Sequence, residues 1–405
     1  AARSAARLGL TFTDLRLDHT ALRAWTDSVV ETLAKGVKGL LQRRGIELIR
    51  GRARFRDSRT LSIEGGDGGT IEFRNAIIAT GSRINALPPG QGLPLWTSAE
   101  ALRLPEVPRR LLVVGGGYIG LEMGLVYAGL GSAVTVAEFS PTLLMGADPD
   151  LVEIMFRSSE KRFAAVLLDS RVAAIERRGE GFAVEIEHQG SRTTHEFDRV
   201  LSAVGRRPAT DDLGLEHTSI VLDERGHIPT NEECRSVEPQ IFAIGDAAPG
   251  PMLAHKASRE GKVAAEVIAG HRSAFDNRAI PAVVFTDPEI AWAGLTEREA
   301  KLSGTPVVVG RFPLSALGRA RTLGRTEGLV KILSDPATKT VLGVGMVGPQ
   351  ASELIAEGTL AIEMGATLED LMVTIHPHPT LSEAILEAAE AAAGAPTHIH
   401  PPRRK

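Results

Sequence analysis

The segment 111–124, LLVVGGGYIGLEMG, limits what this chain can fold into more than any other part of its sequence. An apolar run typical of a buried strand leads into Gly115-x-Gly117-x-x-Gly120, and a helical pattern follows. In such a turn the first glycine permits the tight bend, the second lets the backbone approach a pyrophosphate, and the third lets helix and strand pack closely. The helix N-terminus then stabilises the phosphate charge. The segment predicts an α/β dinucleotide-binding unit; a glycine-rich turn without a ligand is the alternative interpretation.

An acidic residue, Glu138, ends the next predicted strand, AVTVAE. A carboxylate at this place in a dinucleotide fold accepts hydrogen bonds from a ribose 2′-hydroxyl, and it would repel a 2′-phosphate. Residues 139–141 are Phe-Ser-Pro and offer no Arg or Lys to such a phosphate. The sequence therefore favours NAD over NADP, although Glu138 taken alone also fits a solvated charge at a strand end.

Composition excludes several classes of protein. The 405 residues carry 46 Lys and Arg against 50 Asp and Glu, a net charge of −4, which argues against a nucleic-acid partner. The most apolar stretch, 111–137, is interrupted by Glu122 and by glycines, so it fails as a membrane span. The single cysteine, Cys234, excludes an internal disulfide framework, a Cys-based zinc site and dithiol chemistry by this chain alone. We expect a soluble cytoplasmic protein without a metal site.

Periodic patterns predict the elements of the first half of the chain. Apolar residues at helical spacing over 20–44, ended by Gly45, predict a helix. A meander of short predicted strands follows, beginning with IELIRG at 46–51. Alternating strand and helix patterns over 110–205 then predict a parallel α/β sheet.

The second half changes character. A helix is expected near 255–270, and from Pro281 the pattern is that of a separate α+β domain with helices at 351–366 and 382–393. We expect the protein to dimerise through this domain. The apolar positions of its helix 351–366 are Leu354, Ile355, Leu360 and Ile362.

Further motifs flank the fingerprint: IIATGS at 77–82, IFAIGDAA at 241–248, FTDPEIAWAGLTE at 285–297 and HPHPTLSE at 376–383. Together they resemble the pyridine nucleotide–disulfide oxidoreductase family, and within it the members that oxidise dihydrolipoamide, along essentially the whole chain. The resemblance implies a homodimeric flavoprotein with two dinucleotide-binding domains, which binds FAD and NAD. The implied domains are the remainder of an FAD-binding domain at 1–86, an NAD-binding domain at 87–207, a central segment returning to the FAD site at 208–280, and a C-terminal α+β dimerisation domain at 281–405.

The resemblance also assigns residues to the cofactors. Asp246 would bind the ribityl chain of FAD, with the backbone near Ala247 beside it. Thr80 and Gly81 would lie by the FAD. Glu122 would lie near both flavin and nicotinamide, although a carboxylate that favours the helix dipole is the alternative. Two further matched residues, at the return from the NAD-binding domain, are Gly205 and Arg206.

His378 and Glu383 match the acid/base pair of the family. An imidazole suits this role because a thiol must lose a proton near neutral pH, and a carboxylate on the far ring nitrogen fixes the tautomer. In the family this pair reaches the active site of the other subunit, and the substrate is carried by the lipoyl-bearing subunit of a 2-oxo acid dehydrogenase complex. His376 is expected to be structural. We also expect Thr380 or Ser382 to cap the following helix.

The chain departs from the family at its beginning. The family opens with an FAD fingerprint and a redox-active cysteine pair, and this chain shows neither. AARSAARLGL resembles the end of the helix that carries the pair, so we expect the chain to begin just downstream and to be inactive alone. Cys234, in a polar loop, is expected to be incidental. The alternatives are a non-catalytic NAD-binding dimer, or a relative similar to soluble transhydrogenase, glutathione reductase or mercuric reductase.

Overall fold

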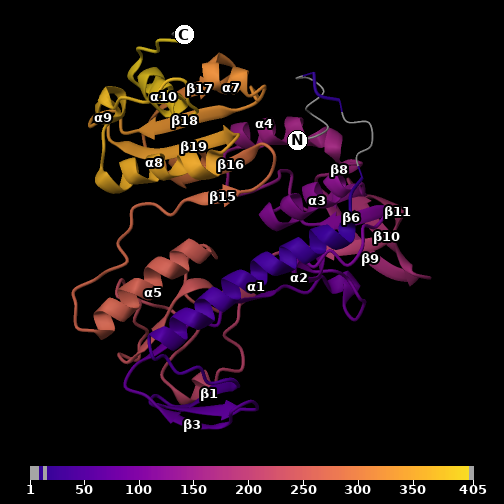
Figure 1. Cartoon of the computed structure of the whole chain (residues 1–405), viewed down its shortest axis with the longest axis vertical. Coiled ribbons are helices and arrows are strands. Elements are labelled where there is room, and N and C mark those ends of the chain that lie inside the picture. The colour runs from indigo at the N-terminus through magenta and orange to yellow at the C-terminus, as the bar shows by residue number, and fades with distance from the viewer. Residues whose placement is uncertain (1–8, 12–15, 401–405) are drawn as a thin grey trace.

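The computed structural model describes residues 9–11 and 16–400, which form three groups of elements (Figure 1). In this view the orange and yellow C-terminal part lies above the magenta fingerprint region, and helix α5 (Ala254–Ile268) and the indigo strands of the N-terminal part lie below. The expected helix end in AARSAARLGL falls on residues 1–10, almost wholly outside the described residues. Within the described ranges, no helical segment has the length and apolar character that a bilayer crossing requires.

A long helix, α1 (His19–Arg43), confirms the prediction made over 20–44. It begins at Asp18, whose carboxylate accepts a hydrogen bond from the Ala21 N–H at 2.9 Å and so satisfies one of the free amides of the first turn. A three-stranded antiparallel sheet follows, in the order β1 (Arg52–Asp57), β2 (Thr60–Glu64) and β3 (Gly69–Glu72).

The strand predicted at 46–51 is wrong. The Arg50 N–H donates to the Asp67 carboxylate at 2.7 Å, and the Arg50 carbonyl accepts from the Asp67 N–H at 2.8 Å. The backbone therefore pairs with a turn between β2 and β3 instead of with a strand. Alternating apolar residues are common to strands and to extended loops, and only a partner strand decides between them.

Two small pairs of strands bring distant segments together beside α5. The strand β4 (Ala76–Ile78) pairs in parallel with β14 (Ile241–Ala243). The next strand after β4 in the chain, β5 (Ser82–Ile84), pairs antiparallel with β13 (Arg206–Pro208). Because the carboxyl ends of parallel strands meet at one edge, the loops after β4 and β14 lie together.

The fingerprint region contains a four-stranded parallel sheet, as predicted, in the order β12-β6-β7-β8. Apolar side chains fill its strands because helices cover a parallel sheet. Its elements are β6 (Arg110–Val114), α3 (Tyr118–Leu130), β7 (Ala133–Ala137), α4 (Pro149–Ser159), β8 (Ala165–Leu167) and β12 (Arg199–Ser202), with the short helix α2 (Ser98–Leu102) before them.

The strands between β8 and β12 do not join the parallel sheet, which corrects the prediction over the whole of 110–205. They form an antiparallel sheet in the order β11-β10-β9. The turn between β10 and β11 places Gln189 and Gly190 at φ 49° and 78°, which is the geometry of a two-residue hairpin turn. Such a turn cannot join parallel strands, which need a crossover. The strands are β9 (Ser170–Arg178), β10 (Gly181–His188) and β11 (Ser191–Phe197).

The C-terminal part is an α+β unit built on a five-stranded antiparallel sheet in the order β15-β16-β19-β18-β17. Helix α8 lies against β16 and β19, and α10 lies against β17 and β18. Its strands are β15 (Ala282–Val284), β16 (Glu289–Gly294), β17 (Val308–Pro313), β18 (Leu329–Ser334) and β19 (Val341–Gly348); its helices are α6 (Glu297–Ser303), α7 (Gly318–Thr322), α8 (Ala351–Met364), α9 (Leu368–Val373) and α10 (Glu383–Ala393).

The two faces of this sheet have different partners. Val344 and Met346 of β19 belong to the core formed with α8 and α10, whereas Val347, on the opposite face, packs with Leu151 of α4 in the core of the fingerprint region. The C-terminal sheet is therefore continuous with the fingerprint region through α4 (Figure 1).

Candidate functional site: two nucleotide-binding edges and a proton-transfer pair

Two of the three fingerprint glycines stand where the backbone leaves no room for a side chain. Gly115 has φ 112°, and a Cβ there would lie 2.4 Å from the Ala203 carbonyl oxygen. A Cβ at Gly120 would lie 2.0 Å from the Gly115 carbonyl oxygen. Gly117, by contrast, has nothing within 4 Å and occupies the N-cap of α3. The backbone is therefore open at Gly117, where α3 begins. A pyrophosphate needs such open space at a helix N-terminus.

Glu138 lies at the same edge, directly after β7. Its carboxylate accepts hydrogen bonds from the Gly116 N–H at 2.5 Å and from the Ser140 N–H at 2.7 Å. The carboxylate is thus bound to the fingerprint turn itself and is not a free solvated charge. A carboxylate offers about four lone-pair sites, so it can accept further hydrogen bonds from a ribose.

The residues predicted to bind FAD meet at the carboxyl ends of β4 and β14. Thr80 and Gly81 follow β4, and Asp246 lies in a short 3-10 turn after β14. Ser82 Oγ donates to Asp246 Oδ2 at 2.5 Å, and the Arg206 guanidinium donates to Ser82 Oγ at 2.7 Å. Gly81 has φ 71° and open space where a side chain would lie. Sequence reasoning missed Ser82, which links Asp246 to Arg206.

Two other assigned residues have backbone roles. Gly205, at φ 97°, accepts a hydrogen bond from the Asn85 N–H at 3.0 Å and so fixes the return from β12 to β13. Ala247 is fully buried, and its carbonyl accepts from the Ile228 N–H at 2.9 Å. Both hold the turns that present Arg206 and Asp246.

A buried ion pair supports the Asp246 turn from below. Lys256 and Glu260, one helical turn apart on α5, are nearly inaccessible to solvent and lie 2.8 Å apart. Glu260 accepts from the Gly245 N–H at 2.6 Å, and Lys256 donates to the Gly245 carbonyl at 3.1 Å. In the sequence this pair is indistinguishable from an exposed i,i+4 pair, so nothing there marked it as part of the site.

Tyr118 and Glu122 lie between the two edges, on the first turns of α3. Glu122 accepts a hydrogen bond from the Phe285 N–H at 2.9 Å, but burial outweighs it and raises the pKa of the carboxyl. Burial also raises the pKa of the Tyr118 hydroxyl, which lies in the field of Arg206, Asp246 and Glu122. Tyr118 therefore faces flavin-side residues from the fingerprint helix; an aromatic residue in that first turn was the signal that sequence reasoning passed over.

The structure brings the two residues of the predicted acid/base pair together. His378 Nδ1 lies 2.8 Å from Glu383 Oε1, and Glu383 Oε2 accepts from the Thr380 N–H at 2.7 Å. Burial opposes ionisation of Glu383, but these hydrogen bonds prevail and lower its pKa. The side chain of His378 is 78 % exposed, so its other ring nitrogen faces outward. The expected side-chain cap is wrong: Ser382 occupies the N-cap but makes no cap hydrogen bond, and the Ala384 and Ile385 N–H groups donate to the Leu381 and Ser382 carbonyls instead.

The neighbouring histidine and the single cysteine have other surroundings. His376 is buried, with Nε2 2.7 Å from Glu357 of α8 and Nδ1 2.9 Å from the Thr374 carbonyl, which agrees with the structural role expected for it. Burial raises the pKa of the Cys234 thiol to about 11. A thiol so rarely ionised is a poor nucleophile. Across the described ranges, no group of three or more His, Cys, Asp or Glu side chains is placed to hold a metal ion.

Two family models match the chain. The pyridine nucleotide-disulphide oxidoreductase model matches residues 3–261, and the dimerisation domain model of the same family matches residues 280–389. The chain is 45% identical over 400 residues to a dihydrolipoyl dehydrogenase of Geobacillus stearothermophilus, covering 98% of this chain and 85% of the relative. It is 47% identical over 389 residues to a dihydrolipoyl dehydrogenase of Thermus scotoductus, covering 95% and 83%.

Solved structures agree with this assignment. LpdA from Mycobacterium tuberculosis superimposes with a TM-score of 0.88 at 28% identity, covering 96% of this chain and 85% of that one. The HOCl-induced flavoprotein disulfide reductase RclA from Escherichia coli gives a TM-score of 0.82 at 27% identity, covering 91% and 85%. The fold, the nucleotide-binding edge and these matches together show that the chain belongs to the pyridine nucleotide-disulphide oxidoreductase family.

Proposed function

We propose that this chain carries the NAD-binding, proton-transfer and dimerisation functions of a flavin-dependent dihydrolipoyl dehydrogenase. The observation that carries the proposal is the His378–Glu383 pair, held at 2.8 Å on an exposed loop of a chain that also presents two nucleotide-binding edges. The relatives from Geobacillus stearothermophilus and Thermus scotoductus, both dihydrolipoyl dehydrogenases, support the choice of substrate.

The cofactors are FAD and NAD(H). When bound, FAD would accept the electron pair of the thiols and NAD⁺ would take it as a hydride. The residues that would hold FAD are Thr80, Gly81 and Asp246, with Tyr118 and Glu122 toward the nicotinamide. The open positions at Gly81 and Gly117 support this fit because a Cβ at either would intrude on the space before the backbone.

The proton chemistry follows from the loop geometry. Because Glu383 binds Nδ1 of His378, that nitrogen carries the proton and the outward Nε2 is free to accept one from a substrate thiol. The nearby carboxylate then stabilises the imidazolium. The same Nε2 can return the proton in the later step, which is the role of a general acid/base.

A homodimer is supported by the match to a dimerisation domain model and by exposed apolar residues in that part of the chain. These residues lie on α8 and on the loop after α9 and include Leu360 at 61 % and Ile375 at 94 % exposure. Of the four apolar positions predicted for contact, Ile355 and Ile362 are buried within their own subunit and Leu354 packs there as well. Leu360 is the one left for a partner. We infer that a second subunit covers these residues and that His378 serves the partner's flavin edge.

Dithiol exchange needs a nucleophilic thiolate and a resolving thiol, and the chain contains one cysteine, which is buried. We therefore infer that the 405-residue chain alone does not turn over lipoamide. Three further points stay predictions: the lipoyl-bearing subunit, the cytoplasmic location, and the domain boundaries at 1–86, 87–207, 208–280 and 281–405.

The test is reconstitution. A segment with a strand–GxGxxG–helix and a Cys-x4-Cys pair is fused before residue 1, and flavin reduction by dihydrolipoamide is followed by stopped-flow absorbance. Flavin binding and turnover should appear together in the fusion and be absent from the 405-residue chain. A fusion that binds flavin and NADH but is never reduced by dihydrolipoamide contradicts the proposed substrate and favours the non-catalytic NAD-binding dimer.

A further inference from the structure

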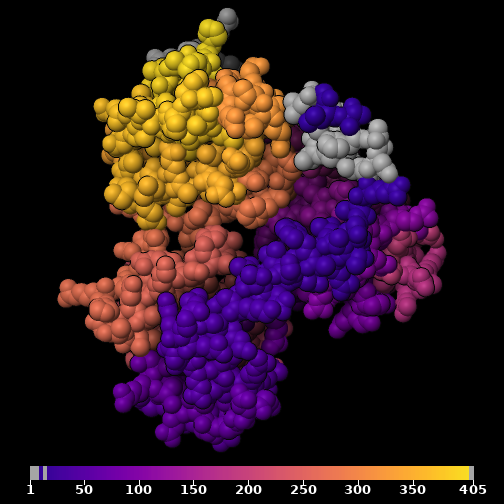
Figure 2. Space-filling model, in the orientation of Figure 1, coloured from indigo at the N-terminus to yellow at the C-terminus, as the bar shows by residue number. Residues whose placement is uncertain are grey.

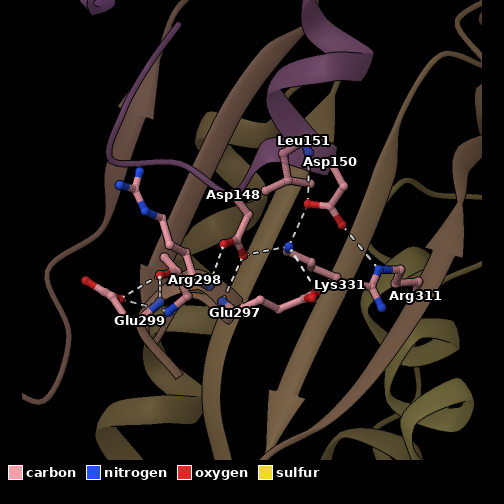
Figure 3. A network of polar contacts seen from close by, with 9 residues as sticks. Asp148, Asp150, Leu151, Glu297, Arg298, Glu299, Arg311 and Lys331 are labelled. Atoms are coloured by element: carbon pink, nitrogen blue, oxygen red, sulfur yellow. Dashed lines mark hydrogen bonds and ion pairs between the residues drawn. The ribbon is translucent and has the colours of Figure 1, made fainter. Parts of the chain in front are cut away.

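A buried lysine lies where the C-terminal sheet meets the fingerprint region. Lys331, in β18, is 1 % exposed, and its ammonium lies 2.6 Å from Asp148, 2.7 Å from Asp150 and 3.1 Å from Glu297 (Figure 3). Asp148 and Asp150 belong to the start of α4, while Glu297 begins α6. An ammonium so far from water is retained only when it is fully paired. One charge of the dimerisation part therefore holds the first turn of α4.

Room for this lysine is provided across the sheet. Gly345 of β19 is the direct cross-strand partner of Lys331. A Cβ at Gly345 would lie 2.8 Å from Leu151 Cδ1 and 3.4 Å from Lys331 Cε. Because Gly345 has no side chain, Leu151 of α4 can approach the sheet closely. The same space accommodates the aliphatic part of the Lys331 side chain.

The residues before α4 form a loop, 139–148, that is bound to the dimerisation part at several points. Asp148, the last of them, accepts from the Glu297 and Arg298 N–H groups at 3.1 Å each, in addition to its pairing with Lys331. Arg298 also donates from its guanidinium to the Met145 carbonyl at 3.0 Å. Figure 3 shows Lys331 and Arg298 reaching toward the loop and the first turn of α4 from the strands and helix opposite.

The other end of the same loop is bound to the nucleotide-binding edge. The loop starts immediately after Glu138, and the Leu144 N–H donates to the Gly116 carbonyl at 3.1 Å. The Leu143 side chain covers Gly116, where a Cβ would lie 2.5 Å from Leu143 Cδ2. Glu138 in turn binds the Gly116 N–H. Loop, fingerprint turn and ribose-binding carboxylate thus share one set of contacts.

We propose that Lys331 and Arg298 of the dimerisation part position the loop 139–148 and thereby set the affinity for the adenosine half of NAD(H). They are positioning residues, since neither contacts the fingerprint turn. The inference rests on the proposed NAD site and names the part of the chain that holds that site in its binding form.

A second ion-pair group across the same boundary supplies the matched control. Asp287, just before β16, pairs with Arg162, in the 3-10 turn after α4, at 2.6 Å and also with Arg325 of its own part. Arg162→Met therefore removes an ion pair across this boundary without touching the loop. Lys331→Met removes the one that holds the loop. A general loosening of the two parts would affect both variants alike.

The experiment measures NADH affinity of the 405-residue chain by fluorescence titration, with ADP-ribose as a competitor that lacks nicotinamide. Lys331→Met should weaken both ligands roughly 3–30-fold, the range expected for residues that act through others. Arg162→Met should leave both dissociation constants unchanged. Arg298→Met, at an exposed side chain that threatens folding less, should weaken both ligands about 2–5-fold.

The possible results distinguish a failure of the proposed NAD site from a failure of this inference alone. Wild-type chain that binds no NADH overturns the proposed function and this inference with it. Wild-type affinity in both Lys331→Met and Arg298→Met, or an equal loss in Arg162→Met, overturns the inference alone. If Lys331→Met fails to fold, Arg298→Met against Arg162→Met decides the question.

Discussion

The two nucleotide-binding edges differ in how the rest of the molecule supports them. The fingerprint edge is backed by α4 and the C-terminal sheet, with Lys331 buried between them. The flavin edge is held within its own part, by the Lys256–Glu260 pair on α5. Helix α1, which precedes the flavin-edge strands in the chain, has 25 residues with none buried and exposes Trp25, Val30 and Leu33 at 64 to 68 %; its indigo segment lies on the surface in Figure 2. An apolar helix face without cover contributes little burial energy. The comparison teaches that the fingerprint edge is braced by another part of the molecule, whereas the flavin edge depends on α5 of its own part and α1 adds little burial.

The largest expected effect concerns chemistry that depends on both edges. In the reconstituted fusion, His378→Gln should slow flavin reduction by dihydrolipoamide about 10²–10⁴-fold, because proton transfer is lost. NADH affinity should stay as it was. Glu383→Gln should act in the same direction and less strongly, since it loosens the orientation of the imidazole. Stopped-flow absorbance provides both rates, and an unchanged rate in His378→Gln would contradict the assigned role.

The next effect contrasts one lysine from each part. Lys331→Met should lower the free energy of unfolding by about 3–5 kcal/mol, because it leaves the buried Asp148 without its counterion. Lys35→Met on α1 removes an exposed pair with Glu31, whose atoms lie 2.8 Å apart, and should cost less than about 0.5 kcal/mol. Urea unfolding followed by circular dichroism measures both. Similar losses in the two variants would abolish the contrast drawn between the parts.

Cofactor choice gives a smaller effect at the well-supported edge. Wild-type chain should bind NADH more tightly than NADPH, and Glu138→Ala should reduce the ratio of the two dissociation constants by about tenfold, or 1.4 kcal/mol. The loss has two sources: a ribose hydrogen-bond acceptor disappears, and so does the charge that repels a 2′-phosphate. Paired titrations of the two dinucleotides measure the ratio. Equal or tighter NADPH binding by the wild-type chain would refute the assignment.

The smallest effect is a difference in pH dependence. Arg162 and Arg325 outweigh burial and lower the pKa of Asp287, so its stabilisation is present above the ordinary pKa and is lost as the pH falls toward the lowered one. Burial raises the pKa of Glu122, so its contribution is present at low pH and is lost as the pH rises through the raised value. Each amounts to less than about 1 kcal/mol.

Unfolding midpoints between pH 3 and 8 check these opposite signs. Asp287→Asn should flatten the acid side of the profile only. Glu122→Gln, which can keep the hydrogen bond from Phe285, should raise stability only above the ordinary range of a glutamate. If both variants changed stability on the same side of the pH profile, the pKa values of the two carboxyls would be shifted in the same direction. That result would contradict this prediction.

The elements that were predicted correctly are those determined by contacts between residues near each other in the sequence. The fingerprint turn, α1, α5 and the helices of the C-terminal part were confirmed because their patterns depend on near neighbours. The prediction extended strand–helix alternation through residue 205 and so missed the hairpin turn at Gln189-Gly190. The helices and strands that could be predicted are those whose hydrogen-bond partners lie within the element or immediately beside it.

Contacts between distant residues account for what sequence reasoning missed. Lys331 stands in the apolar run LVKILS, and Asp148 precedes it by more than 180 residues, so only the folded chain shows that the two meet. Ser82 and Arg206 are likewise separated by 124 positions. A charged residue inside an apolar strand was the available signal, and it indicates a buried partner without naming it.

The buried pair on α5 constrains how this protein can change over generations. Replacing either Lys256 or Glu260 leaves the other charge without water or counterion beneath the Asp246 turn. A lineage that altered one of them would pass through an ancestor with a damaged flavin edge, unless both codons changed nearly together. We therefore expect the two positions to vary as a couple among descendants of a common ancestor, although each looks like an ordinary helix residue.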